Sequence, residues 1–291
     1  MCSKIILVLQ ILNYEGRGDF GRKKAFRVGL VQIPVVLGDR KKNMETVEEW
    51  MKRYYTPGEL TTALILPELW DTGYALDSVE KLADGEAAET TEFLSGLAKR
   101  YGCWFTGGSV MAKSGGKYYN RALIVNPHGE LATFYDKVHL VPFITVEDGV
   151  FDHGEKPCLF DMDGIKCGSI ICYDIRFPEW IRIYALRGAE ALFICSQWTR
   201  ARMDLYRTMI RAHAIENMFY TVAVNNCDYS GDIDFGGGSF VSSPTGDVLT
   251  ECSGTLDGKF SEIDVTNINQ NRQFLKVFEK RLPHLYHDII K

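Results

Sequence analysis

The sequence predicts an α/β fold built from two similar halves. Strand and helix patterns alternate early in the chain and again after residue 165, and a meander of short strands follows in each half. The chain has 291 residues, 46% hydrophobic and 24% charged, which is the composition of a globular protein with a sizeable core. No Pro/Ser-rich linker, charge block or low-complexity run divides it. We therefore expect one domain.

The first half starts with an apolar, β-branched strand at 26–33, FRVGLVQI. Asn43 is the expected N-cap of an amphipathic helix at 44–55. A buried strand follows at 63–67, and a second helix at 88–101 stops at the next glycine. Turn signals then separate short strands at 103–110, 119–126 and 131–136.

The second half repeats this alternation. A strand is expected at 165–172, a helix at 178–188, a strand at 191–196 and a long helix at 201–219. Four strands complete the core, at 220–226, 237–243, 247–251 and 259–265.

The two ends of the chain are expected to lie outside the core domain at 26–265. The apolar run in MCSKIILVLQIL covers about eight residues, which is too short to span a bilayer, and no small-residue cleavage site follows it. Residues 1–25 are therefore predicted to be an extension. Residues 266–291 form a polar tail that, in an oligomer, packs on a neighbouring subunit.

Charge and cysteine usage restrict the partners. The net charge is −5, the pI is near 5.8, and basic residues are interspersed with acidic ones, which disfavours nucleic acid and favours a small-molecule substrate. The eight cysteines form no CxxC pair, and several lie in apolar runs. This is typical of buried, reduced thiols in a cytoplasmic protein that needs no metal and binds no membrane.

Three polar residues end apolar strands: Glu68 after ALILP, Lys137 after LATFYD and Cys172 after IKCGSII. Catalytic groups collect at the carboxyl ends of strands in α/β sheets. A thiol becomes a nucleophile when a base or a positive charge favours its thiolate, and Glu68 and Lys137 are candidates for these roles. Taken singly, each residue also fits an ordinary structural role, as a core thiol, an ion-pair member or a surface lysine.

The surrounding strings make the set specific. PELWDTGY around Glu68, YDKVHLVPF around Lys137 and ICYDIRFPEW around Cys172 resemble, in order, the three catalytic segments of the nitrilase superfamily of carbon-nitrogen hydrolases. The resemblance runs from about Phe26 to Val265 and includes NRALIVNPHGE, RAHAIEN and GGSFVSSPTGDVL. It implies a four-layer α-β-β-α sandwich, a homodimer or larger homo-oligomer, and catalysis without a cofactor.

The resemblance also implies roles for single residues. Glu68 is the expected general base, Cys172 the nucleophile and Lys137 the oxyanion stabiliser, with the backbone N–H of Tyr173 as second oxyanion donor. The implied reaction is attack of Cys172 on an amide carbon, release of ammonia and hydrolysis of the resulting thioester.

Three further residues, Glu147, Trp198 and Arg176, are candidates with open alternatives. Glu147 lies where the family usually has a second glutamate, although it and Asp148 also suit ordinary loop carboxylates. Trp198 is either a pocket wall or a core residue. Arg176 is either a substrate ligand or the ion-pair partner of Glu179. His139 is expected to be structural.

The acyl group is the least specified feature. CYDIRFPE, SQW, RAHAIEN and RLPHLY are together similar to omega-amidases, which hydrolyse the terminal amide of 2-oxo acids such as 2-oxoglutaramate. Such a substrate calls for an arginine, and Arg176 and Arg200 are the candidates. An N-carbamoyl or other aliphatic amide hydrolase is the alternative enzyme, and a catalytically silent binding member of the fold is the alternative of another class. A glutaminase module and a membrane-anchored acyltransferase are disfavoured.

Overall fold

A computed structural model describes residues 24–143 and 145–290. The predicted extension at 1–25 lies outside these residues, except for Lys24 and for Ala25, which begins the first strand. Within the described residues, no helix combines the length and apolarity needed to cross a bilayer.

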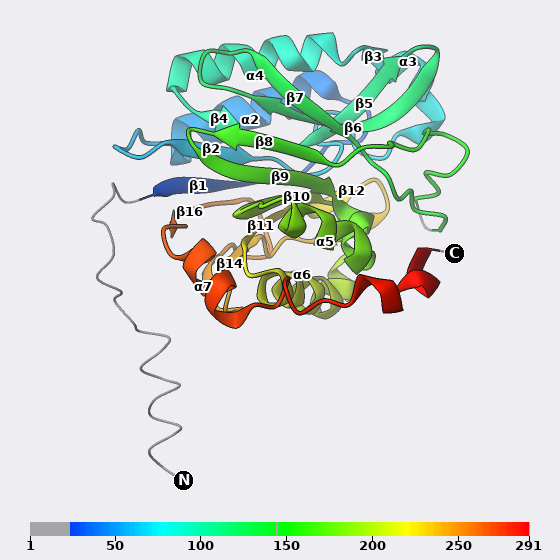
Figure 1. The fold of residues 1–291 in the computed structure, drawn as a ribbon. Helices are drawn as coiled ribbons and strands as arrows, with labels where there is room; N and C mark the ends of the chain where they lie inside the picture. Colours follow the sequence, from blue (N-terminus) through cyan, green and yellow to red (C-terminus); the bar gives the residue numbers. More distant parts are fainter. Residues whose placement is uncertain (1–23, 144, 291) are drawn as a thin grey trace.

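Two β-sheets lie face to face between two layers of helices (Figure 1). The first sheet has the order β16-β1-β2-β4-β6-β5-β3, with β7 paired to β6. Its strands are β1 (Ala25–Gln32), β2 (Thr62–Ile65), β3 (Asp84–Gly85), β4 (Trp104–Phe105), β5 (Ser109–Ser114), β6 (Lys117–Val125), β7 (Leu131–Asp136) and β16 (Asp257–Asp264). Helices α2 (Arg40–Tyr54) and α4 (Ala88–Tyr101) cover its outer face, and the short α3 (Val79–Leu82) lies near β3 (Figure 1).

The second sheet has the order β15-β14-β11-β10-β9-β8. Its strands are β8 (Cys158–Met162), β9 (Ile165–Ile171), β10 (Ala191–Ser196), β11 (Tyr220–Asn225), β14 (Phe240–Ser242) and β15 (Val248–Glu251). Helices α5 (Pro178–Leu186) and α6 (Met203–Asn217) lie below it in Figure 1. This is the four-layer α-β-β-α sandwich that the family resemblance implies.

The side-chain alternation of β1 shows how the layers are held together. Phe26, Val28 and Leu30 point between the sheets, where they pack in the same core as Phe193 of β10. Val31 packs instead with the core under α2 and α4. Successive residues of a strand face opposite sides, so one strand joins two cores.

The predicted helix at 88–101 matches α4 exactly, and its C-cap Gly102 has a φ of 62°. The predicted N-cap Asn43 is wrong. Asp39 caps α2 by accepting from the backbone N–H of Lys42 at 3.0 Å. Asn43 is instead buried inside the helix, where its Nδ2 donates to the carbonyl of Asp71 at 2.8 Å. Both residue types suit an N-cap, and only tertiary contacts distinguish them.

The predicted strand at 103–110 is two strands, β4 and β5. Gly107 and Gly108 interrupt it with φ values of 159° and 105°. An extended chain cannot continue through the φ of Gly108, and glycine is the residue that adopts it without strain. The chain therefore leaves β4 and re-enters the sheet beyond β6.

Several elements have no counterpart in the sequence prediction. Strand β8 and the hairpin of β12 (Cys227–Ser230) and β13 (Ile233–Gly236) lie in segments without clear apolar alternation. The predicted polar tail contains helix α7 (Ile268–Leu275), in which Ile268 is buried and the Arg272 Nη2 donates to the carbonyl of Ala189 at 2.6 Å. The short helical turns are η1 (Leu76–Ser78), η2 (Cys172–Arg176), η3 (Arg200–Arg202), η4 (Pro283–Leu285) and η5 (His287–Ile290).

Candidate active site

The carboxyl ends of the central strands of both sheets meet at one place. The loop after β2 carries Glu68, and the loop after β10 carries Gln197. The Gln197 Nε2 donates to the backbone carbonyl of Glu68 at 2.6 Å, and the Glu68 N–H donates to the carbonyl of Ser196 at 3.4 Å. These bonds fix the Glu68 loop against the second sheet.

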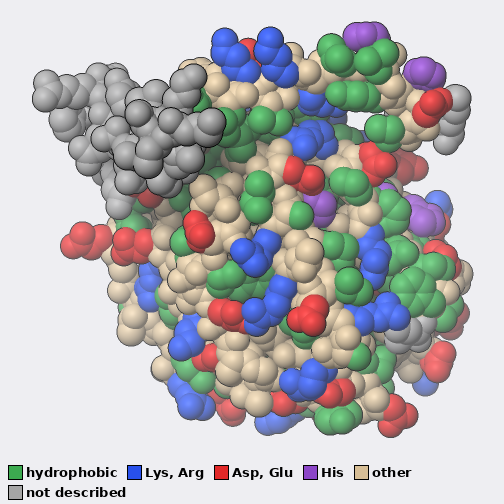
Figure 2. Space-filling model, turned by 90° about the horizontal axis from the view of Figure 1, so that it is seen from below, with side chains coloured by type: hydrophobic (Ala, Val, Ile, Leu, Met, Phe, Trp, Pro, Cys, Tyr) green, Lys and Arg blue, Asp and Glu red, His purple; other side chains and the backbone are tan. Residues whose placement is uncertain are grey.

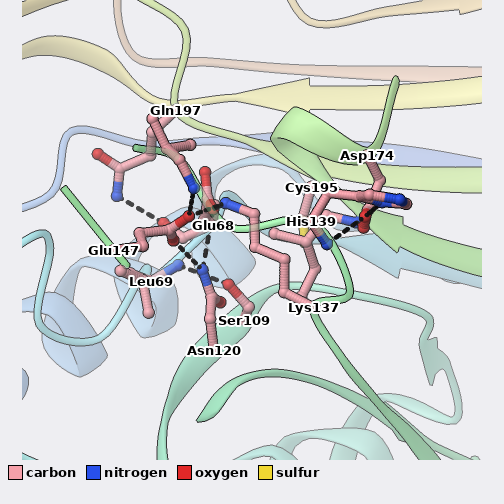
Figure 3. Close-up of polar contacts among 12 residues, drawn as sticks. Glu68, Leu69, Ser109, Asn120, Lys137, His139, Glu147, Asp174, Cys195 and Gln197 are labelled. Atoms are coloured by element: carbon pink, nitrogen blue, oxygen red, sulfur yellow. Dashed lines mark hydrogen bonds and ion pairs between the residues drawn. The ribbon is translucent and has the colours of Figure 1, made fainter. Parts of the chain in front are cut away.

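Glu68, Lys137 and Glu147 form one buried cluster (Figure 3). The Lys137 Nζ lies 2.7 Å from Glu68 Oε1 and 2.6 Å from Glu147 Oε2. Glu147 Oε2 also accepts from the backbone N–H of Val141 at 2.9 Å. Asn120 of β6 completes the cluster, since its Nδ2 donates to both glutamates (Figure 3).

One lysine serves two carboxylates in this cluster. Burial works against the charged form of Lys137, but the carboxylates of Glu147 and Glu68 outweigh it and hold the lysine pKa above its usual value. Burial raises the pKa of Glu147, and the nearby Glu68 charge adds to this increase. The ammonium is therefore permanently charged and lies where it can face a developing negative charge.

Cys172 follows β9 and begins η2 with a φ of 43°, a left-handed backbone conformation that is uncommon outside glycine. The adjacent Asp174 holds this turn, because its Oδ2 accepts from the Ile171 N–H at 3.0 Å and its Oδ1 from the His139 N–H at 3.1 Å. The thiol side chain is 6% exposed.

The Cys172 thiol is protonated at rest. Burial raises its pKa well above the usual value, the Glu68 carboxylate raises it further, and Lys137 acts in the opposite direction. Attack by this sulfur therefore requires a base. Glu68 Oε2 is buried and forms no well-aligned hydrogen bond with a described residue, and the Glu68 carboxylate lies within reach of the Cys172 thiol and the Tyr74 hydroxyl. This oxygen is therefore available to accept the thiol proton.

A cavity of about 60 Å³ opens at Cys172. Tyr173 and Gln197 are part of its wall. Much of the remaining wall consists of aromatic rings and two guanidinium groups, from Tyr74, Phe143, Trp198, Arg176 and Arg202.

No described acidic residue neutralises the two arginines of the wall. The Arg176 guanidinium lies 5.1 Å from the Trp198 ring, and that of Arg202 lies 5.3 Å from the Phe143 ring. Neither forms an ion pair with a described residue, so the alternative of an Arg176–Glu179 pair is not what the structure shows. Arg200 pairs with Asp234 at 2.9 Å and does not line the cavity.

Trp198 lies both in the wall of the cavity and in the core. It lines the cavity, yet its ring is mostly buried and packs 5.6 Å from the Tyr206 ring. His139 has a structural environment, with its Nδ1 2.7 Å from Asp174 Oδ1 and its ring stacked on Phe177.

The sequence prediction did not include six residues of the site: Tyr74, Asn120, Phe143, Asp174, Gln197 and Arg202. Tyr74 ends the PELWDTGY string of Glu68; burial and the charges of Glu68, Glu147 and Cys172 raise the pKa of its hydroxyl well above the usual value. Asn120 directly precedes the string RALIV, which is apolar apart from its arginine. A polar residue beside this apolar run was the signal that the sequence offered. No cluster of three or more His, Cys, Asp or Glu side chains that could hold a metal ion occurs among the described residues.

Comparison with known proteins agrees with this architecture. The carbon-nitrogen hydrolase family profile matches residues 27–269. The chain is 36% identical to the "Hydrolase in agr operon" of Staphylococcus lugdunensis over 78% of this chain and 97% of that one. It is 32% identical to the 2-oxoglutaramate amidase of Bacillus subtilis over 89% of this chain and 98% of that one.

A solved structure also matches. Nit3 of Saccharomyces cerevisiae, described as a member of branch 10 of the nitrilase superfamily, superposes with a TM-score of 0.76 at 27% identity, covering 86% of this chain and 93% of that one. The chain therefore belongs to the carbon-nitrogen hydrolase family of the nitrilase superfamily, and it is a carbon-nitrogen hydrolase that resembles the omega-amidase branch.

Proposed function

We propose that the protein hydrolyses a small linear amide through a thioester on Cys172. The observation that carries this proposal is the buried Glu68–Lys137–Glu147 cluster beside a protonated thiol at the cavity. It combines an unpaired carboxylate oxygen with a fixed positive charge. A proton acceptor and an oxyanion stabiliser are what nucleophilic attack on an amide requires.

In the proposed cycle, Glu68 Oε2 takes the thiol proton while the sulfur bonds to the amide carbon. The resulting oxyanion accepts from Lys137 Nζ and from the backbone N–H of Tyr173. Glu68 returns the proton to the amide nitrogen, the carbon-nitrogen bond breaks, and ammonia leaves. Water then loses a proton to Glu68 and attacks the thioester, which releases the carboxylic acid and restores the thiol. No cofactor takes part in any step.

We infer further that the acyl group is anionic, as in the omega-amide of a 2-oxo dicarboxylic acid. Arg176 and Arg202 line the cavity without an ion-pair partner among the described residues, and guanidinium groups bind carboxylates in paired hydrogen bonds. The relative from Bacillus subtilis is named a 2-oxoglutaramate amidase, which supports this substrate class.

The seven described cysteines are free and buried, in keeping with a cytoplasmic location.

Ammonia release from an amide panel tests the nucleophile. We expect Cys172→Ala to fold like the wild type and to release no ammonia from any amide, whereas Cys195→Ala, the matched buried thiol on β10, retains activity. An active Cys172→Ala protein would refute the proposal. A wild type inactive on every linear amide would favour the silent binding member.

The same panel separates the substrate classes when it includes 2-oxoglutaramate, a neutral aliphatic amide and an N-carbamoyl amino acid. We expect Arg176→Met and Arg202→Met each to raise KM for 2-oxoglutaramate by roughly tenfold or more, because each removes a charged hydrogen bond. Turnover of the neutral amide should change little. Arg200→Met is the matched control, since Arg200 is bound to Asp234 outside the cavity. Preference for the N-carbamoyl compound would favour the alternative hydrolase.

A further inference from the structure

One asparagine contacts all three members of the buried charge cluster. Asn120 Nδ2 donates to Glu68 Oε1 at 2.9 Å and to Glu147 Oε1 at 2.8 Å. Its backbone carbonyl accepts from the Lys137 N–H at 2.9 Å. Asn120 is fully buried in β6, so water does not replace these bonds (Figure 3). The amide group has two N–H bonds, and the two carboxylates use both.

The orientation of this amide follows from its partners. Its Oδ1 is buried and has no hydrogen-bond partner in the described chain. A flipped amide would direct that oxygen at two carboxylate oxygens and would lose both bonds. The side chain therefore acts at this site only as a neutral donor.

The two oxygens of Glu68 have different surroundings as a result. Oε1 accepts from both Asn120 and Lys137, whereas Oε2 accepts from neither and forms no well-aligned hydrogen bond with a described residue; the neighbouring groups of the Glu68 carboxylate are the neutral Tyr74 hydroxyl and Cys172 thiol. An oxygen that already accepts two hydrogen bonds, one from a cation, is the poorer proton acceptor. Oε2 is thus the better proton acceptor of the two Glu68 oxygens.

The charge around Asn120 explains why the donor must be neutral. In the described part of the chain, Glu68 and Glu147 share one cation, Lys137, and the other titratable groups near Glu68 are the hydroxyl of Tyr74 and the thiols of Cys172 and Cys195. A third carboxylate here would favour protonation of one of the two glutamates.

We propose that Asn120 is a positioning residue that holds the carboxylates of Glu68 and Glu147 by one amide group and directs the proton-accepting oxygen of Glu68 toward the substrate side. This inference rests on the proposed role of Glu68 as the base. It predicts that the protonation state of the site, and not only its stability, depends on Asn120.

The test is the pH profile of kcat/KM for Asn120→Asp and Asn120→Ala. Asn120→Asp removes both N–H donors and adds a charge. The acid limb of the profile, where kcat/KM falls with decreasing pH, should therefore shift to higher pH by roughly one unit or more. Asn120→Ala removes the donors only and should move it by less. The pH dependence of iodoacetamide alkylation at Cys172, followed by mass spectrometry, gives the same comparison without turnover.

Asn217→Asp is the matched control. Asn217 is also fully buried with an unpartnered Oδ1, but its Nδ2 donates to the carbonyl of His213 at 3.0 Å and to Glu216 Oε1 at 3.4 Å on α6, and it does not contact Glu68, Lys137 or Glu147. It should lower stability and leave the acid limb in place. If the Asn120 variants keep the wild-type limb while Cys172→Ala is inactive, the positioning role is wrong and the proposed function stands. An active Cys172→Ala would instead remove the proposed function itself.

Discussion

At the scale of single residues, the stability of the fold depends strongly on the charge of one buried lysine. Lys137 has no exposed side-chain surface and compensates the carboxylates of Glu68 and Glu147. A buried charge that loses its partner is strongly destabilising, whereas removing both partners costs much less. This asymmetry separates the structural contribution of Lys137 from its chemical one.

We predict that Lys137→Met lowers the free energy of unfolding by about 3–5 kcal/mol, because two buried carboxylates lose their cation. Lys137→Met combined with Glu147→Gln should recover much of this loss and still release no ammonia. Urea unfolding measures the first quantity and an ammonia assay the second. Activity in the double variant would show that Lys137 serves stability alone.

A second buried charge lies under the Glu68 loop. Burial raises the pKa of Asp71 from 3.8 to about 6, and the ion pair with Arg40 only partly opposes this increase. The folded state therefore holds the Asp71 proton more tightly than the unfolded chain. Its contribution to stability is complete below pH 3.8 and is lost as the pH rises through about 6.

We predict that the free energy of unfolding of the wild type falls relative to that of Asp71→Asn between pH 4 and pH 6, by up to about 3 kcal/mol. Urea unfolding of both proteins across this range measures the difference. Asp77→Asn, at an exposed position, should leave the difference constant. A difference that rises with pH would mean that the Arg40 pair outweighs burial.

At the scale of elements, the break between β4 and β5 positions the base. Ser109, the first residue of β5, accepts from the Leu69 N–H at 2.9 Å through its Oγ. A Cβ on the preceding Gly108 would lie 2.6 Å from the Leu66 Cβ and 3.1 Å from the Trp70 Cδ1. The glycine thus allows β5 to approach the segment that carries Glu68.

We predict that Gly108→Ala destabilises the fold by about 3 kcal/mol or more and lowers kcat/KM, because it combines backbone strain with displacement of the Glu68 loop. Gly115→Ala is the control: its φ of 57° also favours glycine, but no atom lies within 4 Å of the added Cβ. It should cost about 1–2 kcal/mol and leave kcat/KM unchanged. Equal effects on kcat/KM would contradict the positioning role of Gly108.

The elements also differ in how far local signals define them. Helix α4 has an apolar face and a C-terminal glycine, so its bounds follow from its own residues. The start of α2 does not follow from its own residues, because Asp39 and Asn43 are both suitable N-caps. The contact of Asn43 with the Asp71 carbonyl decides between them. Helix α7 is short and mostly polar, and the anchor that identifies it, Arg272, binds carbonyls that are distant in sequence.

At the scale of the whole molecule, charge is dispersed while apolar side chains remain exposed near the C-terminus. Lys, Arg, Asp and Glu side chains are interspersed on the face below α6 and α7 (Figure 2). Phe274 in the last turn of α7 is 63% exposed, and Leu285 in η4 is 60% exposed. Apolar surface of this kind is typical of contact surfaces between proteins.

We predict a homodimer or larger homo-oligomer in sedimentation experiments, with the C-terminal segment contributing to the contact. Phe274→Glu combined with Leu285→Glu should shift the protein toward monomer, because charges oppose burial of this surface. Lys113→Glu, an exposed change on β5, should not. A wild type that sediments as a monomer at all concentrations would contradict the prediction.

The sequence by itself determined the α/β class, because strand and helix periodicity is a local property. Its strings of adjacent residues resemble those of a known family, and that resemblance implied the four-layer fold and the roles of Glu68, Lys137 and Cys172. Only the tertiary structure decided that Glu147 shares Lys137 with Glu68, that Asn120 joins them, and that Arg202 lines the cavity while Arg200 pairs with Asp234. The physical reason is that a side chain's partners come from other segments of the chain. Burial and packing bring those segments together, and no local pattern records which ones meet.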